Sequence, residues 1–431
     1  MERYYQPEIE CASREQILAW QNERLVKQVQ NVWDNVPYYR KKMEEKGLTP
    51  GDIKGVADLS KLPFVTKDDL REAYPYGLNA RPLKDCVRIQ STSGTTGKRV
   101  VAFYTQHDLD LWEDCCARAI VAAGGTNEDV CHVSYGYGLF TGALGLHQGW
   151  EKVGASVVPI SSGNTERQIN LMRDFGVTAL VATPSYAMYM CEVAEKMGAL
   201  KDLKLRIGVF GAEGSTEEMR AQLEKRWGII ATENYGLSEI VGPGVAGECT
   251  CKCGMHINED LFYCEIVDPA TGEPLPDGEL GELVITPLKK QALPLLRYRT
   301  HDMTRIFREP CACGRTTARM QKIAGRSDDM LIIRGVNVFP SQIESVLLKV
   351  EGIGPNYEII VTRENYMDRL EVRCELTDAR LLDAYAELEA LTKKIRERLR
   401  VVLQIDAKVT LVSPNTLKRF EGKARRVTDL R

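Results

Sequence analysis

The chain has 431 residues, of which 44% are apolar and 27% charged, so it can bury its own core and should form two or three structural units. Its 57 basic and 60 acidic residues give a formal charge of -3 and alternate finely, which argues against a nucleic-acid or anionic-membrane partner. No apolar run approaches the roughly 18 residues that cross a bilayer, and the N-terminus lacks the apolar core of a signal peptide. We therefore expect a cytoplasmic protein.

The N-terminal half is predicted to alternate between helices and strands. Residues 13–46 have helical spacing, and a second helix should begin after Thr66, with Asp69 at its third position as in a capping box. Further on, short β-rich runs alternate with helical ones. The strands are expected at 177–182 and 206–210, and the helices at 184–196 and 216–226. This alternation indicates a mostly parallel sheet covered by helices.

The C-terminal half changes character twice. After Met255, short strands and turns (262–267, 276–278 and 282–286) suggest a smaller antiparallel subdomain. From Met330 the pattern is strand, helix, strand, strand, long helix and strand, with the long helix at 378–399. We therefore predict an α/β protein with a large N-terminal domain, residues 1–327, and a small α+β C-terminal domain, residues 328–431.

A run of small hydroxyls and glycines lies between likely strands at 87–90 and 100–104. Its backbone N–H and side-chain O–H groups can converge on phosphate oxygens, while Lys98 supplies positive charge. It is not a Walker A loop, because only two residues separate its glycines and Arg99 follows the lysine. A phosphate-binding loop is favoured over a hairpin turn, and its residues are Ser93, Gly94, Thr95, Thr96, Gly97 and Lys98.

Four further segments contain residues that suggest a binding or catalytic role, but each segment alone is only a weak indication. Residues 234–239 place an aromatic residue before a glycine and end in Glu239, a hard oxygen ligand suited to Mg²⁺. Asp302 follows a basic strand and could accept hydrogen bonds from two ribose hydroxyls. Residues 325–337 combine charges and glycines at the domain boundary, as a hinge would. Lys423 lies beside a glycine near the C-terminus, where most lysines are simply solvated.

In this order and spacing, the five segments resemble the adenylate-forming superfamily of acyl- and aryl-CoA ligases. More narrowly, the whole chain resembles the phenylacetate–CoA ligases, and residues 33–40, 135–142 and 328–340 carry much of that likeness. The resemblance implies two half-reactions. A carboxylate attacks the α-phosphate of ATP to give an acyl-adenylate and pyrophosphate, and the thiol of coenzyme A then displaces AMP.

The resemblance also implies roles for individual residues. The phosphate loop would hold the β- and γ-phosphates, Glu239 would bind Mg²⁺, and Lys423 would stabilise the charge that develops in the first step. The remaining nucleotide contacts would come from Gly211, Ala212, Glu213, Asn234, Tyr235, Gly236, Ser238, Asp302 and Arg326. Asp328 lies where the family's hinge residue lies. Rotation of the C-terminal domain would then withdraw Lys423 and line a pantetheine tunnel with Arg334, Gly335, Val336 and Asn337.

The acid pocket is predicted from aromatic residues with glycine spacers, which make a flat apolar slot for an aryl ring. The alternative is a core strand and turn that happen to carry aromatics. The candidates are Tyr135, Tyr137, Phe140, Thr141 and Gly142, together with Ala212. Phenylacetate is the default substrate from resemblance, while hydroxyphenylacetate, indoleacetate or a benzoate-type acid could also fit.

Two groups of cysteines predict a structural zinc site, since a Cys-x-Cys-Gly turn suits a tetrahedral zinc knuckle. Six residues compete for four positions. The resemblance favours Cys249, His256, Cys311 and Cys313, whereas two knuckles alone would suggest Cys251, Cys253, Cys311 and Cys313. Relatives are often homodimers, so a homodimer is expected here.

Two other functions compete with that of a coenzyme A ligase. An adenylating enzyme could instead transfer its acyl group to a carrier protein, but no carrier domain is attached. The cysteine knuckles could form a nucleic-acid-binding module, but the balanced charge argues against it. We therefore expect small-molecule partners: a carboxylic acid, ATP and coenzyme A.

Overall fold

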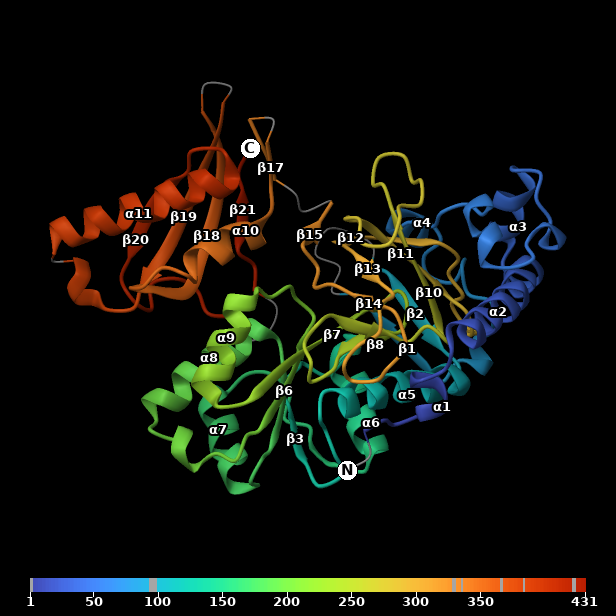
Figure 1. The fold of residues 1–431 in the computed structure, drawn as a ribbon, viewed down its shortest axis with the longest axis horizontal. Helices are drawn as coiled ribbons and strands as arrows, with labels where there is room; N and C mark the ends of the chain where they lie inside the picture. Colours follow the sequence, from blue (N-terminus) through green and yellow to red (C-terminus); the bar gives the residue numbers. More distant parts are fainter. Residues whose placement is uncertain are drawn as a thin grey trace. The chain divides into compact units, whose positions relative to one another are not determined.

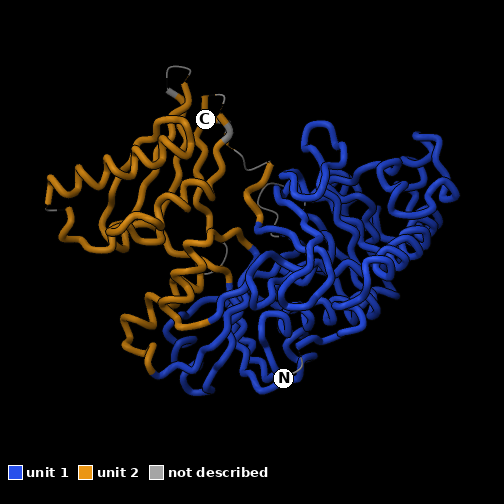
Figure 2. Tube along the Cα trace, in the orientation of Figure 1, with its two compact units in different colours: residues 1–182, 202–212, 230–322 blue, residues 183–201, 213–229, 323–431 orange. Residues whose placement is uncertain are grey.

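The computed structural model describes residues 3–92, 99–327, 331–334, 336–364, 367–382, 384–420 and 424–431. The chain divides into two compact units, which Figure 2 colours separately. Unit 1 comprises residues 1–182, 202–212 and 230–322, and unit 2 comprises residues 183–201, 213–229 and 323–431. Among the residues described, no helix is both long and apolar enough to cross a membrane.

A mixed sheet forms the centre of unit 1 (Figure 1). Its parallel part contains β3 (Val130–Val133), β4 (Ser156–Val158), β5 (Ala179–Ala182), β6 (Ile207–Gly211) and β7 (Ile230–Leu237). It continues with antiparallel β8 (Gly242–Glu248), β9 (Met255–Ile257), β14 (Arg319–Met320) and β13 (Ile306–Phe307). Strands β5 and β6 are buried along their whole length, which explains their unbroken apolar sequence. The predicted parallel sheet is confirmed.

Helices α5 (Gln106–Ala122) and α6 (Thr141–Val153) pack against each other and against β8, while α7 (Thr165–Asp174) precedes β5. The glycines of β8 permit this close approach. A Cβ atom on Gly247 would lie 2.6 Å from the Cβ of Ala119 in α5, which is shorter than van der Waals contact allows. Cys115 and Cys116 are fully buried in α5 beside this contact, as expected of packing residues.

The N-terminal region contains α1 (Pro7–Glu10), α2 (Arg14–Asn35), α3 (Pro37–Glu44) and α4 (Lys67–Glu72). The predicted helical stretch 13–46 is therefore two helices, because Pro37 has no N–H to continue α2 and instead begins α3. The predicted capping box of α4 is confirmed. The N–H of Thr66 donates to the Asp69 carboxylate at 2.8 Å, and the N–H of Asp69 donates back to the Thr66 hydroxyl at 3.3 Å.

Two groups of antiparallel strands complete unit 1. Strand β1 (Arg88–Ser91) pairs with β2 (Val101–Tyr104), as predicted for the strands that flank the phosphate loop. Strands β10 (Phe262–Val267), β11 (Gly281–Pro287) and β12 (Tyr298–Thr304) form the predicted antiparallel subdomain.

Unit 2 contains α8 (Pro184–Lys196) and α9 (Glu217–Trp227), which pack together, and the C-terminal part of the chain. The latter runs β15 (Gly325–Arg326), β16 (Leu331–Ile333), β17 (Val336–Val338), α10 (Pro340–Leu347), β18 (Ile353–Glu364), β19 (Met367–Leu376), α11 (Tyr385–Leu403), β20 (Lys408–Val412) and β21 (Val427–Asp429). A sheet in the order β20-β19-β18-β21 packs against α10 and α11 around residues such as Ile343, Ile359 and Leu399.

The predicted long helix 378–399 is wrong at both ends. Residues 379–382 form a 3₁₀ segment, and α11 runs from Tyr385 to Leu403. The helix continues past Leu399 because Leu403 also reaches the apolar core. The division of the chain at residue 328 stays a prediction.

Candidate active site

A cavity of about 100 Å³ lies in unit 1 beside the carboxyl ends of β3, β6 and β7. Five of the six predicted acid-pocket residues line it: Tyr135, Phe140, Thr141, Gly142 and Ala212. The other lining residues are Leu146, Asn234, Gly236, Leu237, Ser238 and Pro243. Tyr137 does not line it, and its hydroxyl instead lies 2.9 Å from Nδ1 of His147.

Two aromatic rings form the apolar wall of this cavity. The hydroxyl of Tyr135 donates to the carbonyls of Ala182 at 2.8 Å and Gly211 at 3.0 Å, which fixes the ring at the ends of β5 and β6. The ring of Phe140 meets it edge-on, with 6.0 Å between centroids. Gly142 leaves room for Phe140, because a Cβ atom there would lie 2.4 Å from that ring.

The turn after β7 presents Ser238 and Glu239. The hydroxyl of Ser238 lies 3.0 Å from that of Thr141, and the carboxylate of Glu239 lies 3.3 Å from the ammonium of Lys67 in α4. Glu239 is only 5% exposed, so its negative charge requires a cationic partner. A buried carboxylate of this kind fits the predicted Mg²⁺ ligand.

Tyr235 and Asp302 meet from strands β7 and β12. The Tyr235 hydroxyl donates to the Asp302 carboxylate at 2.6 Å, and the N–H of Asp302 donates to the Thr300 hydroxyl at 3.0 Å. Burial, reinforced by the charge of Asp302, raises the pKa of Tyr235 well above its usual value. Asn234 lies one residue earlier, and its amide oxygen accepts a hydrogen bond from the N–H of Gly244 at 3.0 Å.

Several predicted site residues lie in unit 2. The carboxylate of Glu213 accepts hydrogen bonds from the N–H groups of Ser185 at 2.7 Å and Ala424 at 2.9 Å. Arg326 is on β15 and Val336 on β17. Arg334 follows β16 with φ of 51° and donates to the carbonyl of Asp368 at 3.0 Å.

Other predicted residues lie outside the described part of the chain. These are the phosphate loop Ser93, Gly94, Thr95, Thr96, Gly97 and Lys98, the hinge residue Asp328, Gly335, and Lys423. Asn337 is described only through its backbone on β17.

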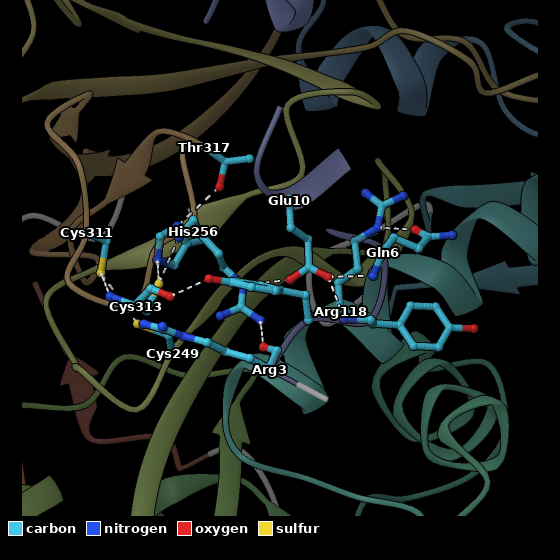
Figure 3. Close-up of polar contacts among 12 residues, drawn as sticks. Arg3, Gln6, Glu10, Arg118, Cys249, His256, Cys311, Cys313 and Thr317 are labelled. Carbon is cyan, nitrogen blue, oxygen red and sulfur yellow. Dashed lines mark hydrogen bonds and ion pairs between the residues drawn. The ribbon is translucent and has the colours of Figure 1, made fainter. Parts of the chain in front are cut away.

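A second cluster in unit 1 brings together the four favoured metal ligands (Figure 3). One ligand atom from each of Cys249, His256, Cys311 and Cys313 lies within 4.8 Å of all the others, and all four residues are buried. The Sγ atoms of Cys249 and Cys311 are 3.7 Å apart, and Nε2 of His256 is 3.3 Å from Sγ of Cys313. Cys₃His is one of the usual donor sets of structural zinc.

The surroundings of the cluster also suit a metal. The Nδ1 atom of His256 lies 3.1 Å from the Thr317 hydroxyl, which leaves Nε2 directed at the sulfurs. The N–H of Cys313 donates to Sγ of Cys311 at 3.5 Å, and the N–H of Arg315 donates to Sγ of Cys313 at 3.4 Å. The hydrogen bond from Cys249, followed by that from His256, lowers the pKa of the Cys313 thiol. These contacts favour a thiolate at Cys313.

The competing ligands are less well placed. Cys251 and Cys253 are both exposed, although Sγ of Cys253 lies 3.4 Å from Sγ of Cys311. All thirteen cysteines lie in the described ranges, and each has a free thiol.

The sequence-based predictions did not include three features of these sites. The N-terminal segment packs on the cysteine knuckle, where Tyr4 donates to the carbonyl of Cys313 at 3.0 Å and Arg315 pairs with Glu10 at 2.6 Å. Lys67 and Lys290 both approach the turn after β7. A lysine in the first turn of a helix opposes the helix dipole, so Lys67 offered a signal. Lys290 also carries a signal in the sequence, because it interrupts a run of apolar residues.

Two protein-family models and several curated relatives match most of the chain. The AMP-binding enzyme family matches residues 19–287, and the AMP-binding enzyme C-terminal domain matches residues 335–431. The phenylacetate-coenzyme A ligase of Escherichia coli (strain K12) is 47% identical over 98% of this chain and 97% of its own. The enzyme of the same name from Thermus thermophilus is 46% identical over 99% of each chain.

A solved structure extends the similarity to the whole fold. The crystal structure of 2-hydroxyisobutyryl-CoA ligase in complex with R3-HIB-AMP superposes with a TM-score of 0.94 at 29% identity, covering 100% of this chain and 93% of that one. The predicted α/β fold with a large AMP-binding domain and a smaller C-terminal domain is confirmed. The chain therefore belongs to the AMP-binding enzymes and is an acid–thiol ligase of the phenylacetate-coenzyme A ligase family.

Proposed function

We propose that the protein joins phenylacetate to coenzyme A through an acyl-adenylate, using ATP and Mg²⁺. The observation that carries this proposal is the cavity beside the carboxyl ends of parallel strands, where ligands of open α/β sheets bind. Two aromatic residues, Tyr135 and Phe140, line it, and so do the polar residues Thr141 and Ser238, whose hydroxyls lie 3.0 Å apart. Such a site accepts an aryl group on one side and a reacting carboxylate on the other.

In the first half-reaction a carboxylate oxygen attacks the α-phosphorus of ATP, and the bond to the bridging oxygen breaks to release pyrophosphate. The protein supplies positioning and charge compensation. Glu239 would hold Mg²⁺, which neutralises phosphate charge when bound, and Ser238 would contact the α-phosphate. The phosphate loop 93–98 would hold the β- and γ-phosphates, and Lys423 would stabilise the developing charge.

The nucleoside part of ATP would be held by further residues of the predicted site. Asp302, oriented by Tyr235, would accept hydrogen bonds from the ribose hydroxyls, with Arg326 assisting. The adenine would be bracketed by Gly211, Ala212, Glu213, Asn234, Tyr235 and Gly236.

In the second half-reaction the thiol sulfur of coenzyme A attacks the acyl carbon, and AMP leaves with the bonding electrons. A C-terminal domain of residues 328–431 would rotate about Asp328 between the two steps. Residues 334–337 would then line the channel for the pantetheine arm. The match of an AMP-binding enzyme C-terminal domain to residues 335–431 supports a separate domain there.

The cluster of Cys249, His256, Cys311 and Cys313 would bind zinc in a structural role. Its burial and its complete set of four protein ligands support that role over catalysis. Family resemblance alone supports a cytoplasmic homodimer, for which sedimentation velocity is the direct test of assembly.

The proposed function is tested by measuring AMP release with ATP, Mg²⁺ and coenzyme A across a panel of aryl and alkyl carboxylic acids. Turnover with arylacetates that depends on coenzyme A supports the proposal, and Lys423→Ala should suppress pyrophosphate release. Adenylate without thioester would point to a carrier protein as acceptor. The absence of AMP release with every acid of the panel would overturn the assigned reaction.

A further inference from the structure

Lys290 is a buried cation close to the proposed metal ligand Glu239 but separate from it. It lies in the segment between β11 and β12, and it is only 6% exposed. No carboxylate in the described part of the chain lies within 4.0 Å of its ammonium. A lysine buried in this way is costly unless its charge is used.

The contacts of Lys290 are with the main chain and with an aromatic face. Its ammonium donates to the carbonyl of Ile240, the residue after Glu239. It also lies 4.4 Å from the centroid of the Tyr104 ring, so a cation–π contact partly replaces lost hydration. Burial lowers the pKa of Lys290 to about 8, which Asp108 and then Glu239 oppose, so the ammonium form predominates at pH 7.

Tyr104 holds the same turn from a second point. Its hydroxyl donates to the carbonyl of Val241 at 2.9 Å. The N–H groups of Ile240 and Val241 both donate to the carbonyl of Leu237, at 3.1 Å and 3.2 Å, which closes the turn 237–241. Consecutive carbonyls of this turn are therefore held by two buried side chains, while Ser238 and Glu239 face other partners.

The backbone of Lys290 is itself anchored. Its carbonyl accepts a hydrogen bond from Nε2 of Gln28 at 2.8 Å. The next two N–H groups, of Gln291 and Ala292, donate to the carboxylate of Asp108 at 2.6 Å and 3.0 Å. The ammonium thus projects from a fixed support, as positioning a functional turn requires.

We propose that Lys290 is a positioning residue for adenylation, whose ammonium holds the Ile240 carbonyl and so fixes where the turn 237–241 presents Ser238 and Glu239. This inference rests on the proposed roles of Ser238 and Glu239 toward Mg²⁺ and ATP. Lys290 does not touch the reacting atoms, and it acts through the turn.

The test compares Lys290→Met with Lys289→Met, a control at the adjacent lysine, which is half-buried and does not donate to this turn. The readouts are the KM for MgATP, the Mg²⁺ concentration for half-maximal rate, kcat and the thermal midpoint. Loss of one charged hydrogen bond predicts a rise of about tenfold in the KM for MgATP in Lys290→Met. Lys290→Arg should recover part of that loss, and Lys289→Met should match the wild type.

A merely structural role would lower the amount of active enzyme and hence kcat, with the KM unchanged. That result, or an equal KM rise in Lys289→Met, would overturn the inference. If Lys290→Met does not fold, Lys290→Gln decides, because it removes the charge beside the Ile240 carbonyl but keeps a polar side chain. A raised KM for MgATP then supports the inference, and an unchanged KM overturns it. Failure of the proposed function itself would differ, because the wild type would then release no AMP.

Discussion

The hydroxyl of Tyr235 donates to the carboxylate of Asp302 at 2.6 Å and so ties the end of β7 to β12. A hydrogen bond to a charged acceptor at this distance is strong and directional. It fixes the orientation of the carboxylate of Asp302, a residue that is only 9% exposed. The hydrogen bond thereby orients the carboxylate that we propose binds the ribose.

Replacing Tyr235 by Phe should weaken ATP binding more than it slows chemistry. Without its donor, the Asp302 carboxylate loses orientation and a charged hydrogen bond, so the KM for ATP should rise about tenfold. Steady-state kinetics at saturating phenylacetate and coenzyme A measure this. An unchanged KM for ATP, with an unchanged melting midpoint, would show that Asp302 does not depend on Tyr235.

Replacing Glu239 by Gln should remove the proposed Mg²⁺ ligand while preserving the shape of the turn. The adenylation rate should fall about 100-fold, and more Mg²⁺ should be needed for half-maximal rate, because an amide is a weaker ligand for this ion. The ion pair with Lys67 is lost as well, so the melting midpoint serves as the control for folding. Pyrophosphate release that stays at the wild-type rate across a Mg²⁺ titration would remove Glu239 from this role.

Much of the fold was predictable because its signals are local. Buried strands such as β5 and β6 read as apolar runs, and the capping box of Thr66 and Asp69 marks the start of α4. Of the two errors in helix boundaries, one has a tertiary cause and the other a local one. The core contact of Leu403 extends α11, and Pro37 divides the N-terminal helical stretch.

The site was predictable only where its residues form recognisable motifs. The acid pocket and the four favoured cysteine and histidine ligands do so, and most of them meet in space. Lys67 and Lys290 lie far along the sequence from the turn that they contact, so no motif includes them. Such long-range contacts are set by the tertiary fold, which brings α4 and the segment between β11 and β12 to this turn.

Metal removal should destabilise the protein without changing its active site. Cys311→Ser should abolish stoichiometric zinc binding and lower the melting midpoint by about 5 °C or more, because a buried ligand set is left unpaired. Cys251→Ser is the matched control, since Cys251 is exposed and should leave both unchanged. Zinc retained by Cys311→Ser would exclude the proposed set, and zinc lost from Cys251→Ser would favour the alternative one.

Widening the cavity should change acid selectivity. Phe140→Ala removes one of the two rings that wall the pocket, so kcat/KM for phenylacetate should fall about tenfold relative to the bulkier indoleacetate. Tyr137→Phe is the control, because Tyr137 contacts His147 and does not line the cavity. Equal losses for both acids in Phe140→Ala would mean that this ring does not contact the acyl group.

Acid stability should depend on His132, which is fully buried on β3 with Nε2 3.1 Å from the amide oxygen of Gln168. Burial lowers the pKa of His132 from 6.5 to about 4, so between these values the unfolded chain binds a proton that the folded chain does not. Stability therefore falls as the pH is lowered through this window. At pH 5 the loss of unfolding free energy from this one group is about 2 kcal/mol relative to pH 7.

Urea unfolding followed by tryptophan fluorescence measures this loss. His132→Gln should lack this acid-dependent loss of stability, whereas His107→Gln, at a half-buried site, should keep it. Equal acid losses in His132→Gln and the wild type would show that His132 is not held neutral by the fold.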